Sequence, residues 1–215
     1  MKKYFIFLCL LVPSIACCYE GIKDLPSHRK NTEIISDIVG NELQMKPAGL
    51  DAVRYIAENI SRIGARALEN GFDTDAYTYQ VIAGWPNYTW VPLWEGGDIP
   101  FTLFIYIWPP RGQDSTPIHS HPIPCALTVL KNSITQENFE IIDKGIVRMN
   151  GSKKLVEGDC EVDVLLDSFV HRVSCRENGP EPAFTLHLYA KGTAKEVRNT
   201  FYKTFPRHSY NLSEN

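Results

Sequence analysis

The stretch Glu-Pro-Ala-Phe-Thr-Leu-His-Leu-Tyr, residues 181–189, alternates apolar and polar side chains with the period of a β-strand. One face carries Phe184, Leu186 and Leu188, as a barrel strand packed under other elements requires. The opposite face carries Thr185, His187 and Tyr189. Burying a hydroxyl, an imidazole and a phenol without partners is costly. We therefore expect this face to line a cavity, with Thr185 orienting His187 and His187 orienting Tyr189; the alternative is a solvated face.

Short β-prone runs also occur upstream of this stretch. They are separated by Pro, Gly, Asn and Asp at intervals of roughly eight to twelve residues, the rhythm of an all-β barrel or sandwich. The runs are Phe101–Trp108, Ala126–Leu130, Phe139–Ile142, Gly145–Met149, Glu161–Leu166 and Phe184–Tyr189. The pattern predicts a mainly β fold, a small β-barrel.

Helical spacing of apolar residues precedes these runs. It covers Glu33–Leu43 and continues from Leu50 to Ile63, between Pro47 and Gly71. These segments predict two amphipathic helices packed against the barrel. We expect one domain over residues 20–215, with a helical front at about 30–75 and the barrel at about 77–205.

Composition and charge exclude several function classes. The chain has 215 residues, 44% of them hydrophobic, and a net charge of −3. That charge gives no reason to expect binding to nucleic acid or to an anionic membrane. We expect a monomer whose partners are small molecules, so the function has to be read from a site.

The N-terminus has the pattern of an export signal. Met1-Lys2-Lys3 is basic, and residues 4–15 form an apolar run too short to span a bilayer comfortably. Small residues before Cys17 favour cleavage after residue 16, with no transmembrane helix in the mature chain. Cys17 is also placed as the lipid acceptor of a bacterial lipoprotein, so the protein is expected to be periplasmic, secreted or lipid-anchored. The alternative is a buried N-terminal element.

The cysteines do not form a disulfide framework. Their spacing is unequal, and the chain has no C-x-x-C pair. Two alternatives stay open for Cys160 and Cys175, a disulfide between neighbouring strands or two buried thiols.

The stretch Thr-Pro-Ile-His-Ser-His-Pro-Ile-Pro-Cys, residues 116–125, places potential metal ligands on one strand face. Where the chain is extended, His119, His121 and Cys125 point the same way. Its prolines cannot donate ladder hydrogen bonds, which favours a sheet edge or a barrel mouth. His171 lies far enough along the chain to return on a neighbouring strand. Three imidazoles suit Fe, Zn, Cu or Ni; the alternatives are a surface pair and a core histidine.

These motifs together resemble the cysteine dioxygenase-like (thiol dioxygenase) family of the cupin superfamily. The resemblance runs through W-P-P-R-G-Q-D-S-T-P-I-H-S-H (108–121), Cys125, D-S-F-V-H-R-V (167–173) and E-P-A-F-T-L-H-L-Y (181–189), and more weakly through V-R-N-T-F-Y-K-T-F (197–205). It covers the barrel portion, about residues 77–205. It implies a small cupin barrel of jelly-roll type and an enzyme that oxidises a thiol.

The resemblance also implies the parts of the site. His119, His121 and His171 would hold one Fe(II) per chain, and a small thiol and O2 would be converted to a sulfinic acid. Tyr189 would hold the bound oxygen or the substrate through its hydroxyl. Cys125, which stands where most cupins have a metal-binding glutamate, would cross-link to Tyr189 through a thioether.

The sequence departs from the family where an arginine grips the substrate carboxylate. The matching segment is Tyr88-Thr89-Trp90, and an indole with one neutral donor cannot replace a guanidinium. Other arginines could take over, namely Arg111, Arg148 and Arg172, of which Arg111 is best placed. The candidate pocket residues are Tyr88, Trp90, Trp108 and Arg111. The substrate is thus cysteine-like or cysteamine-like; the alternative function is a non-oxygenase cupin, either another metal-dependent enzyme or a metal- or ligand-binding protein.

Overall fold

The computed structural model describes most of the chain from residue 22 onward. The described residues are 22, 24–44, 49–78, 88–95, 101–110, 115–121, 124–163, 170–175, 181–190, 200–201 and 203–204. The predicted leader at residues 1–16, Cys17 and Arg111 lie outside this part of the chain.

Helices form the N-terminal part of the described chain. They are α2 (Pro26–Leu43), α3 (Leu50–Glu58) and α4 (Ile60–Glu69), followed by the 3-10 turn η1 (Asp75–Tyr77). The predicted helical front is confirmed, but the expectation of one helix over residues 50–63 was wrong. Asn59 interrupts it with φ −107° and ψ 12°, and its side-chain amide donates a 2.8 Å hydrogen bond to the Tyr55 carbonyl. Asparagine competes with the helix backbone in this way, so the helix stops and restarts.

Two sheets follow the helices. The first sheet has the order β1-β2-β9-β4-β7. Its strands are β1 (Thr89–Glu95), β2 (Phe101–Trp108), β9 (Ala183–Ala190), β4 (Cys125–Lys131) and β7 (Cys160–Asp163). The second sheet has the order β10-β3-β8-β5-β6-β11. Its strands are β10 (Thr200–Phe201), β3 (His119–Ser120), β8 (Val170–Ser174), β5 (Ser133–Asp143), β6 (Ile146–Val156) and β11 (Lys203–Thr204).

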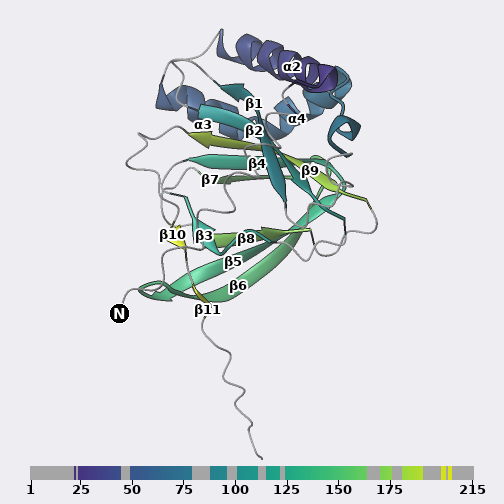
Figure 1. Ribbon diagram of the computed structural model, residues 1–215. Coiled ribbons are helices and arrows are strands. Elements are labelled where there is room, and N and C mark those ends of the chain that lie inside the picture. The colour runs from purple at the N-terminus through teal and green to yellow at the C-terminus, as the bar shows by residue number, and fades with distance from the viewer. Residues whose placement is uncertain are drawn as a thin grey trace, which may run out of the picture.

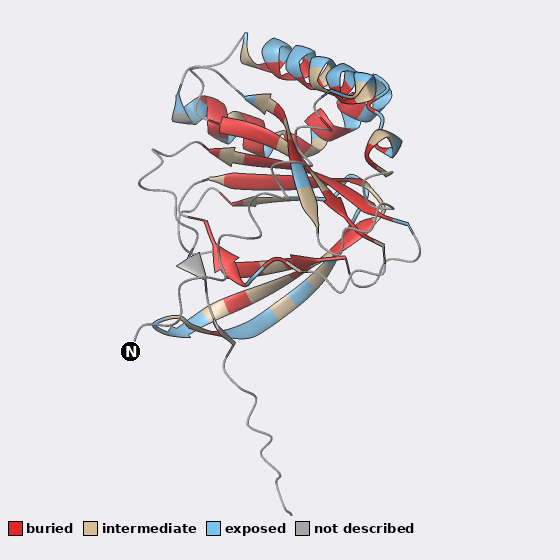
Figure 2. Cartoon of the chain, viewed as in Figure 1, coloured by how far each residue is buried: buried red, intermediate tan, exposed pale blue. Residues whose placement is uncertain are grey.

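The two sheets face each other, and the helices cover the outer face of the first (Figure 1). The strand pairs are antiparallel except for β11 with β6. The outer surfaces of the helices and much of β6 are exposed, whereas the first sheet is largely buried (Figure 2). The predicted fold class, a mainly β barrel with N-terminal helices packed against it, is confirmed.

The predicted strands have the correct positions in the sequence, but several observed strands differ from them in length. All six predicted runs contain observed strands, although β5 and β6 extend well beyond the predicted Phe139–Ile142 and Gly145–Met149. Residues 164–166 of the predicted run Glu161–Leu166 lie outside the described residues. Strand β1 was not predicted; it contains Pro92 and has a register shift between Pro92 and Trp94. It lies at the sheet edge, where a strand tolerates proline.

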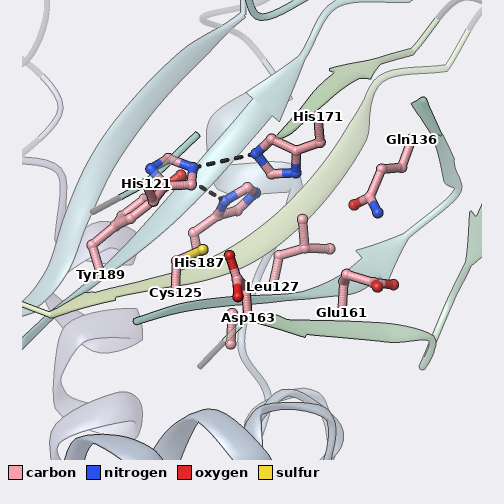
Figure 3. A pocket seen from close by; sticks show the side chains of 10 residues that line it. His121, Cys125, Leu127, Gln136, Glu161, Asp163, His171, His187 and Tyr189 are labelled. Carbon is pink, nitrogen blue, oxygen red and sulfur yellow. Dashed lines mark hydrogen bonds between the residues drawn. The ribbon is translucent and has the colours of Figure 1, made fainter. Parts of the chain in front are cut away.

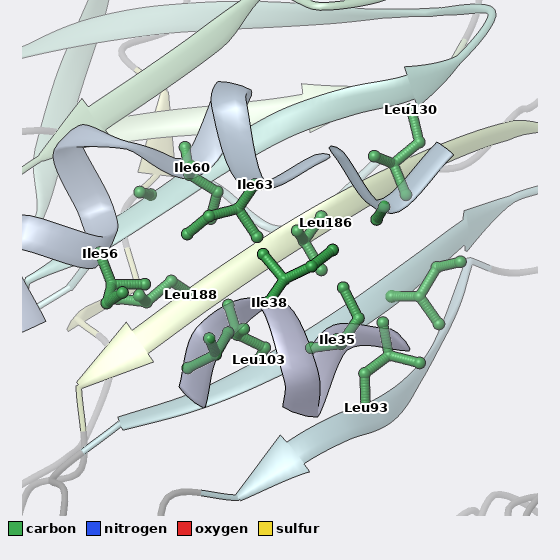
Figure 4. Packing of buried hydrophobic residues seen from close by; sticks show 14 of the residues in the cluster. Ile35, Ile38, Ile56, Ile60, Ile63, Leu93, Leu103, Leu130, Leu186 and Leu188 are labelled. Atoms are coloured by element: carbon green, nitrogen blue, oxygen red, sulfur yellow. The ribbon is translucent and has the colours of Figure 1, made fainter. Parts of the chain in front are cut away.

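A large apolar core lies between the helices and the first sheet. Ile56, Ile60 and Ile63 meet Leu103, Leu186 and other buried aliphatic side chains there (Figure 4). Full burial of each such side chain stabilises the fold by about 1.5–3 kcal/mol. Helix α4 approaches β4 closely at Gly64, where a Cβ atom would lie 2.9 Å from Thr128 Cγ2. A larger residue at position 64 would clash with the Thr128 side chain, so glycine lets the helix pack directly on the sheet.

The alternation of β9 is as predicted. Phe184, Leu186 and Leu188 belong to the core under the helices. Because successive strand residues face opposite sides, the polar residues of β9 face the second sheet. A smaller apolar cluster joins the two sheets, with Leu127 and Val129 on one side and Ile134 and Val173 on the other. The space between the sheets is thus part apolar and part polar.

Candidate metal centre and cavity

Three buried histidines from two neighbouring strands meet between the sheets. His119 lies on β3 and is the direct cross-strand partner of His171 on β8, and His121 follows β3. The predicted return of His171 to a neighbouring strand is therefore confirmed. The segment before β3 is held to β8 at Thr116, whose backbone N–H donates to the Val173 carbonyl and whose Oγ1 accepts from the Val173 N–H. These bonds set the register that brings the histidines together.

The imidazole nitrogens converge on one point. His121 Nε2 lies 3.1 Å from His119 Nε2 and 3.3 Å from His171 Nε2, and all three ligand atoms lie within 4.8 Å of one another. Two nitrogens bound at about 2.1 Å to one metal ion, at right angles, lie about 3 Å apart. The cluster thus fits three adjacent ligands of one metal ion and can bind a metal.

Burial favours the neutral form of two of these imidazoles, His119 and His171. Burial lowers the pKa of His119, and burial followed by the charges of His119, His121 and His187 lowers the pKa of His171 well below its ordinary value. His119 Nδ1–H donates a 2.7 Å hydrogen bond to the Pro117 carbonyl, which leaves its Nε2 lone pair for a metal. Neutral imidazole is the form that binds metal ions.

The polar face of β9 carries a chain of hydrogen bonds. Trp108 Nε1 donates to Thr185 Oγ1 at 2.9 Å, Thr185 Oγ1 lies 2.8 Å from His187 Nε2, and His187 Nδ1 lies 3.2 Å from the Tyr189 hydroxyl. Burial, reinforced by the charges of His121 and His119, lowers the pKa of His187 to about 3. His187 is therefore neutral, and each of its ring nitrogens faces a hydroxyl.

Tyr106 is a further member of this site that the sequence reasoning missed. Its ring stacks on His187 with ring centres 4.0 Å apart. Burial raises the pKa of Tyr106 to about 12, and a hydrogen bond with Tyr189 acts in the opposite direction. The available signal was its phase on β2, two residues before Trp108, because residues two apart on a strand share a face.

Cys125 lies beside Tyr189. The two are cross-strand partners on β4 and β9, and Cys125 is 6% exposed. Burial, followed by the charge of Asp163, raises the pKa of the Cys125 thiol to about 12. The structure thus places this thiol and phenol next to each other, as a cross-link between them would require.

A cavity opens between the sheets beside the histidines. Figure 3 shows the side chains that line it, which are His121, Cys125, Ala126, Leu127, Gln136, Glu161, Asp163, His171, His187 and Tyr189. The register across β9, β4 and β7 arranges them in rows, Tyr189–Cys125–Asp163 and His187–Leu127–Glu161. The sequence reasoning missed Leu127, Gln136, Glu161 and Asp163, because only the pairing of distant strands brings them to the site.

The predicted pocket residues Tyr88, Trp90 and Trp108 are not among the residues that line the cavity. Tyr88 packs against Tyr106 and Trp108, at ring-centre distances of 6.0 and 5.1 Å. Trp90 is 44% exposed on β1 and meets Phe104 edge to face. Phe104 in turn contacts Tyr189, so Trp90 lies at the margin of the site.

The other two arginines proposed for substrate binding lie in ion pairs. Arg172 Nη2 donates a 2.8 Å hydrogen bond to Glu137, and the guanidinium lies over the Phe139 ring. Arg148 pairs with Glu140 at the protein surface. No arginine is among the described residues that line the cavity.

Two further findings concern the cysteines and the helices. No disulfide joins Cys160 and Cys175; Cys160 is exposed and Cys175 is buried. Among the helices in the described ranges, none combines the length and the hydropathy needed to cross a membrane.

The chain was compared with known proteins. No protein-family model matches it, and no curated protein matches its sequence. Its structure is similar to that of a sugar phosphate isomerase of the cupin superfamily from Silicibacter pomeroyi, at 19% identity and a TM-score of 0.35, over 45% of this chain and 54% of that one. It is similar to an oxalate oxidase at 16% identity and a TM-score of 0.40, over 53% and 54% of the two chains. It is also similar to a DMSP lyase from Ruegeria pomeroyi, at 15% identity and a TM-score of 0.37, over 53% of this chain and 51% of that one. The aligned part spans about half of each solved chain, so the likeness says nothing about activity.

Proposed function

We propose that this protein is an Fe(II)-dependent dioxygenase that converts a small thiol into its sulfinic acid. The observation that carries the proposal is the composition of the buried cluster, three imidazoles and no carboxylate, next to a small cavity that holds Tyr189 and Cys125. Neutral ligands leave the charge of a divalent ion uncompensated, which favours an anionic thiolate as the next ligand.

The reaction is balanced without another reductant. In RSH + O2 → RSO2H, both oxygen atoms pass to sulfur, and the four electrons that sulfur loses are those that O2 gains. A sulfinic acid is the oxidation level of sulfur that does not readily reverse. Ferrous iron held by His119, His121 and His171 would lower the pKa of the substrate thiol and activate O2.

The residues of β9 would position a hydrogen-bond donor next to the substrate. The Trp108 N–H can only donate, so Thr185 accepts from it. The Thr185 hydroxyl is then able to donate to His187 Nε2, and His187 Nδ1–H to the Tyr189 oxygen. In this arrangement the Tyr189 hydroxyl hydrogen is directed to the substrate or to Tyr106. Burial raises the pKa of Tyr189 well above its ordinary value, which keeps this hydrogen in place.

We also propose that Cys125 and Tyr189 form a thioether, in which a C–S bond replaces the cysteine S–H and one ring C–H bond and O2 accepts the two electrons and two protons released. Their direct pairing across β4 and β9 supports it, and a cross-link would restrict rotation of the Tyr189 ring. The function itself is tested by loading the purified chain with Fe(II) without oxygen, adding a panel of thiols, and measuring oxygen uptake and the sulfinic acid formed. Equal amounts of oxygen and thiol consumed would support the proposal. Stoichiometric iron with no oxygen uptake for any thiol would favour the alternative, a metal-binding protein without oxygenase activity.

A further inference from the structure

We infer that Gln136, Glu161 and Asp163, which all line the cavity, provide the binding site for the ammonium group of the substrate. The substrate would then be an aminothiol without a carboxylate. The thiol part of this inference rests on the proposed function, whereas the ammonium site rests on the contacts of these three residues alone.

Gln136 presents a buried acceptor to the cavity. The residue is fully buried at 0% exposure, and its Nε2 donates to Asn138 Oδ1 at 3.1 Å. Its Oε1 atom has no hydrogen-bond partner in the described part of the chain. Figure 3 shows its amide directed toward Leu127 and into the cavity. A buried carbonyl oxygen without a donor is costly, so a ligand that brings an N–H there gains a hydrogen bond.

Two carboxylates, Asp163 and Glu161, also line the cavity. Asp163, 8% exposed, pairs with Cys125 across β4 and β7, and Glu161 pairs with Leu127. Glu161 also forms an ion pair with Lys153, whose side chain is 41% exposed. Asp163 raises the pKa of Cys125 through its charge, so its field extends into the cavity. Neither lysine nor arginine is among the described lining residues.

This set of groups selects a cation. An ammonium group has three N–H donors and no acceptor, and here it would meet one amide oxygen and carboxylate oxygens. A carboxylate at the same place would be repelled by Asp163, and Lys153 is already paired with Glu161. Leu127 also lines the cavity and provides apolar surface for a short carbon chain. A thiol sulfur near the histidines and an amine near Gln136 can therefore belong to one small molecule.

The first experiment measures binding of n-propylammonium, which has no thiol, by calorimetry on the full chain under anaerobic conditions. 1-Propanol and propionate serve as the neutral and anionic matches, and a metal-stripped sample is measured in parallel. We expect propylammonium to bind at least about tenfold more tightly than either match, with or without metal. Asp163→Asn and Gln136→Leu should each weaken it by about tenfold. Glu140→Gln, which changes an exposed carboxylate on β5 paired with Arg148, should leave binding unchanged.

The thermal unfolding midpoint of each variant shows whether it is folded, and either variant alone suffices for the test. Equal affinity for the three probes would overturn the inference. So would binding that neither variant changes, or binding that is lost when the metal is removed.

The second experiment separates this inference from the proposed function. Oxygen uptake is compared for 2-aminoethanethiol, 1-propanethiol and cysteine. Amine binding that depends on Asp163 and Gln136, with no thiol oxidised, would support the ammonium site and refute the dioxygenase. Oxidation of 1-propanethiol as efficient as that of 2-aminoethanethiol, unchanged by both variants, would support the dioxygenase and refute the ammonium site.

Discussion

Cys125 and Tyr189 lie directly opposite each other on the paired strands β4 and β9. Directly opposed residues on one sheet face have Cβ atoms about 4.5–5.5 Å apart, within reach of a covalent bond between their side chains. Tyr189 also ends the hydrogen-bond chain through His187. This pairing therefore places the end of the β9 hydrogen-bond chain next to Cys125, which lines the cavity.

The first prediction is the cross-link itself. After incubation with Fe(II), O2 and a thiol substrate, a fraction of the chain should lose two hydrogen atoms in mass, with residues 125 and 189 joined in one peptide pair. Cys125→Ser should abolish this species and keep the fold, because serine is close to isosteric. Cys175→Ser, which changes another buried cysteine, is the matched control and should still cross-link. The thioether would be excluded if intact mass and peptide mapping find no joined pair under turnover.

The second prediction concerns the metal. His171→Ala should reduce iron from about one ion per chain to near zero, because two imidazoles bind far more weakly than three. Elemental analysis after anaerobic loading and desalting measures this. His28→Gln is the control, since His28 is a buried histidine bonded to Tyr77 away from the cavity. Full iron retention in His171→Ala would remove His171 from the site.

The third prediction is acid sensitivity of folding. The pKa of His187 is lowered from 6.5 to about 3 in the folded chain, so the unfolded chain binds its proton at higher pH. The free energy of unfolding is then at its full value above pH 6.5 and falls as the pH drops toward 3. The slope from this group is at most about 1.4 kcal/mol per pH unit.

Urea unfolding of the metal-free chain at several pH values measures this dependence. His187→Gln should make the free energy of unfolding depend less steeply on pH between 3 and 6.5. The other buried histidines still contribute to the remaining dependence. An identical pH dependence in the variant would show that His187 does not carry the effect.

The fourth prediction concerns Trp90, which stands where the resembling family has an arginine. Trp90 lies at the margin of the site, against Phe104. Trp90→Arg should raise kcat/KM for cysteine relative to 2-aminoethanethiol by roughly tenfold, because a guanidinium can pair with the carboxylate. Trp90→Phe removes the indole without adding charge and should not change the ratio. Efficient oxidation of cysteine by the natural chain that is lost in Arg111→Ala would instead assign the carboxylate to Arg111.

The fifth prediction is export. We propose that residues 1–16 are removed in the host, and that Cys17 then begins the mature chain, with or without a lipid. N-terminal mass analysis of protein from its native host should find no peptide from residues 1–16. Recovery of intact Met1 would contradict cleavage, and an acyl mass on Cys17 would distinguish a lipid anchor from soluble export.

Much of this protein can be predicted from local patterns. The alternation of residues 181–189 specified which side chains of β9 face the core and which face the cavity, because the side-chain period of a strand is fixed at two. The spacing of His119 and His121 in an extended segment predicted that both imidazoles point the same way. The helical front was also predictable, apart from the break at Asn59, where a side chain competes with the backbone.

The tertiary structure decided which distant residues meet. His171 joins the other histidines because β3 pairs with β8. Asp163 and Glu161 reach the cavity because β7 pairs with β4 in one register, and Gln136 because β5 lies beside β8. A shift of one residue would turn each side chain to the opposite face. Local periodicity determines which face of a strand is polar, whereas long-range strand pairing determines which residues that face contacts. The proposed substrate preference depends on the long-range pairing.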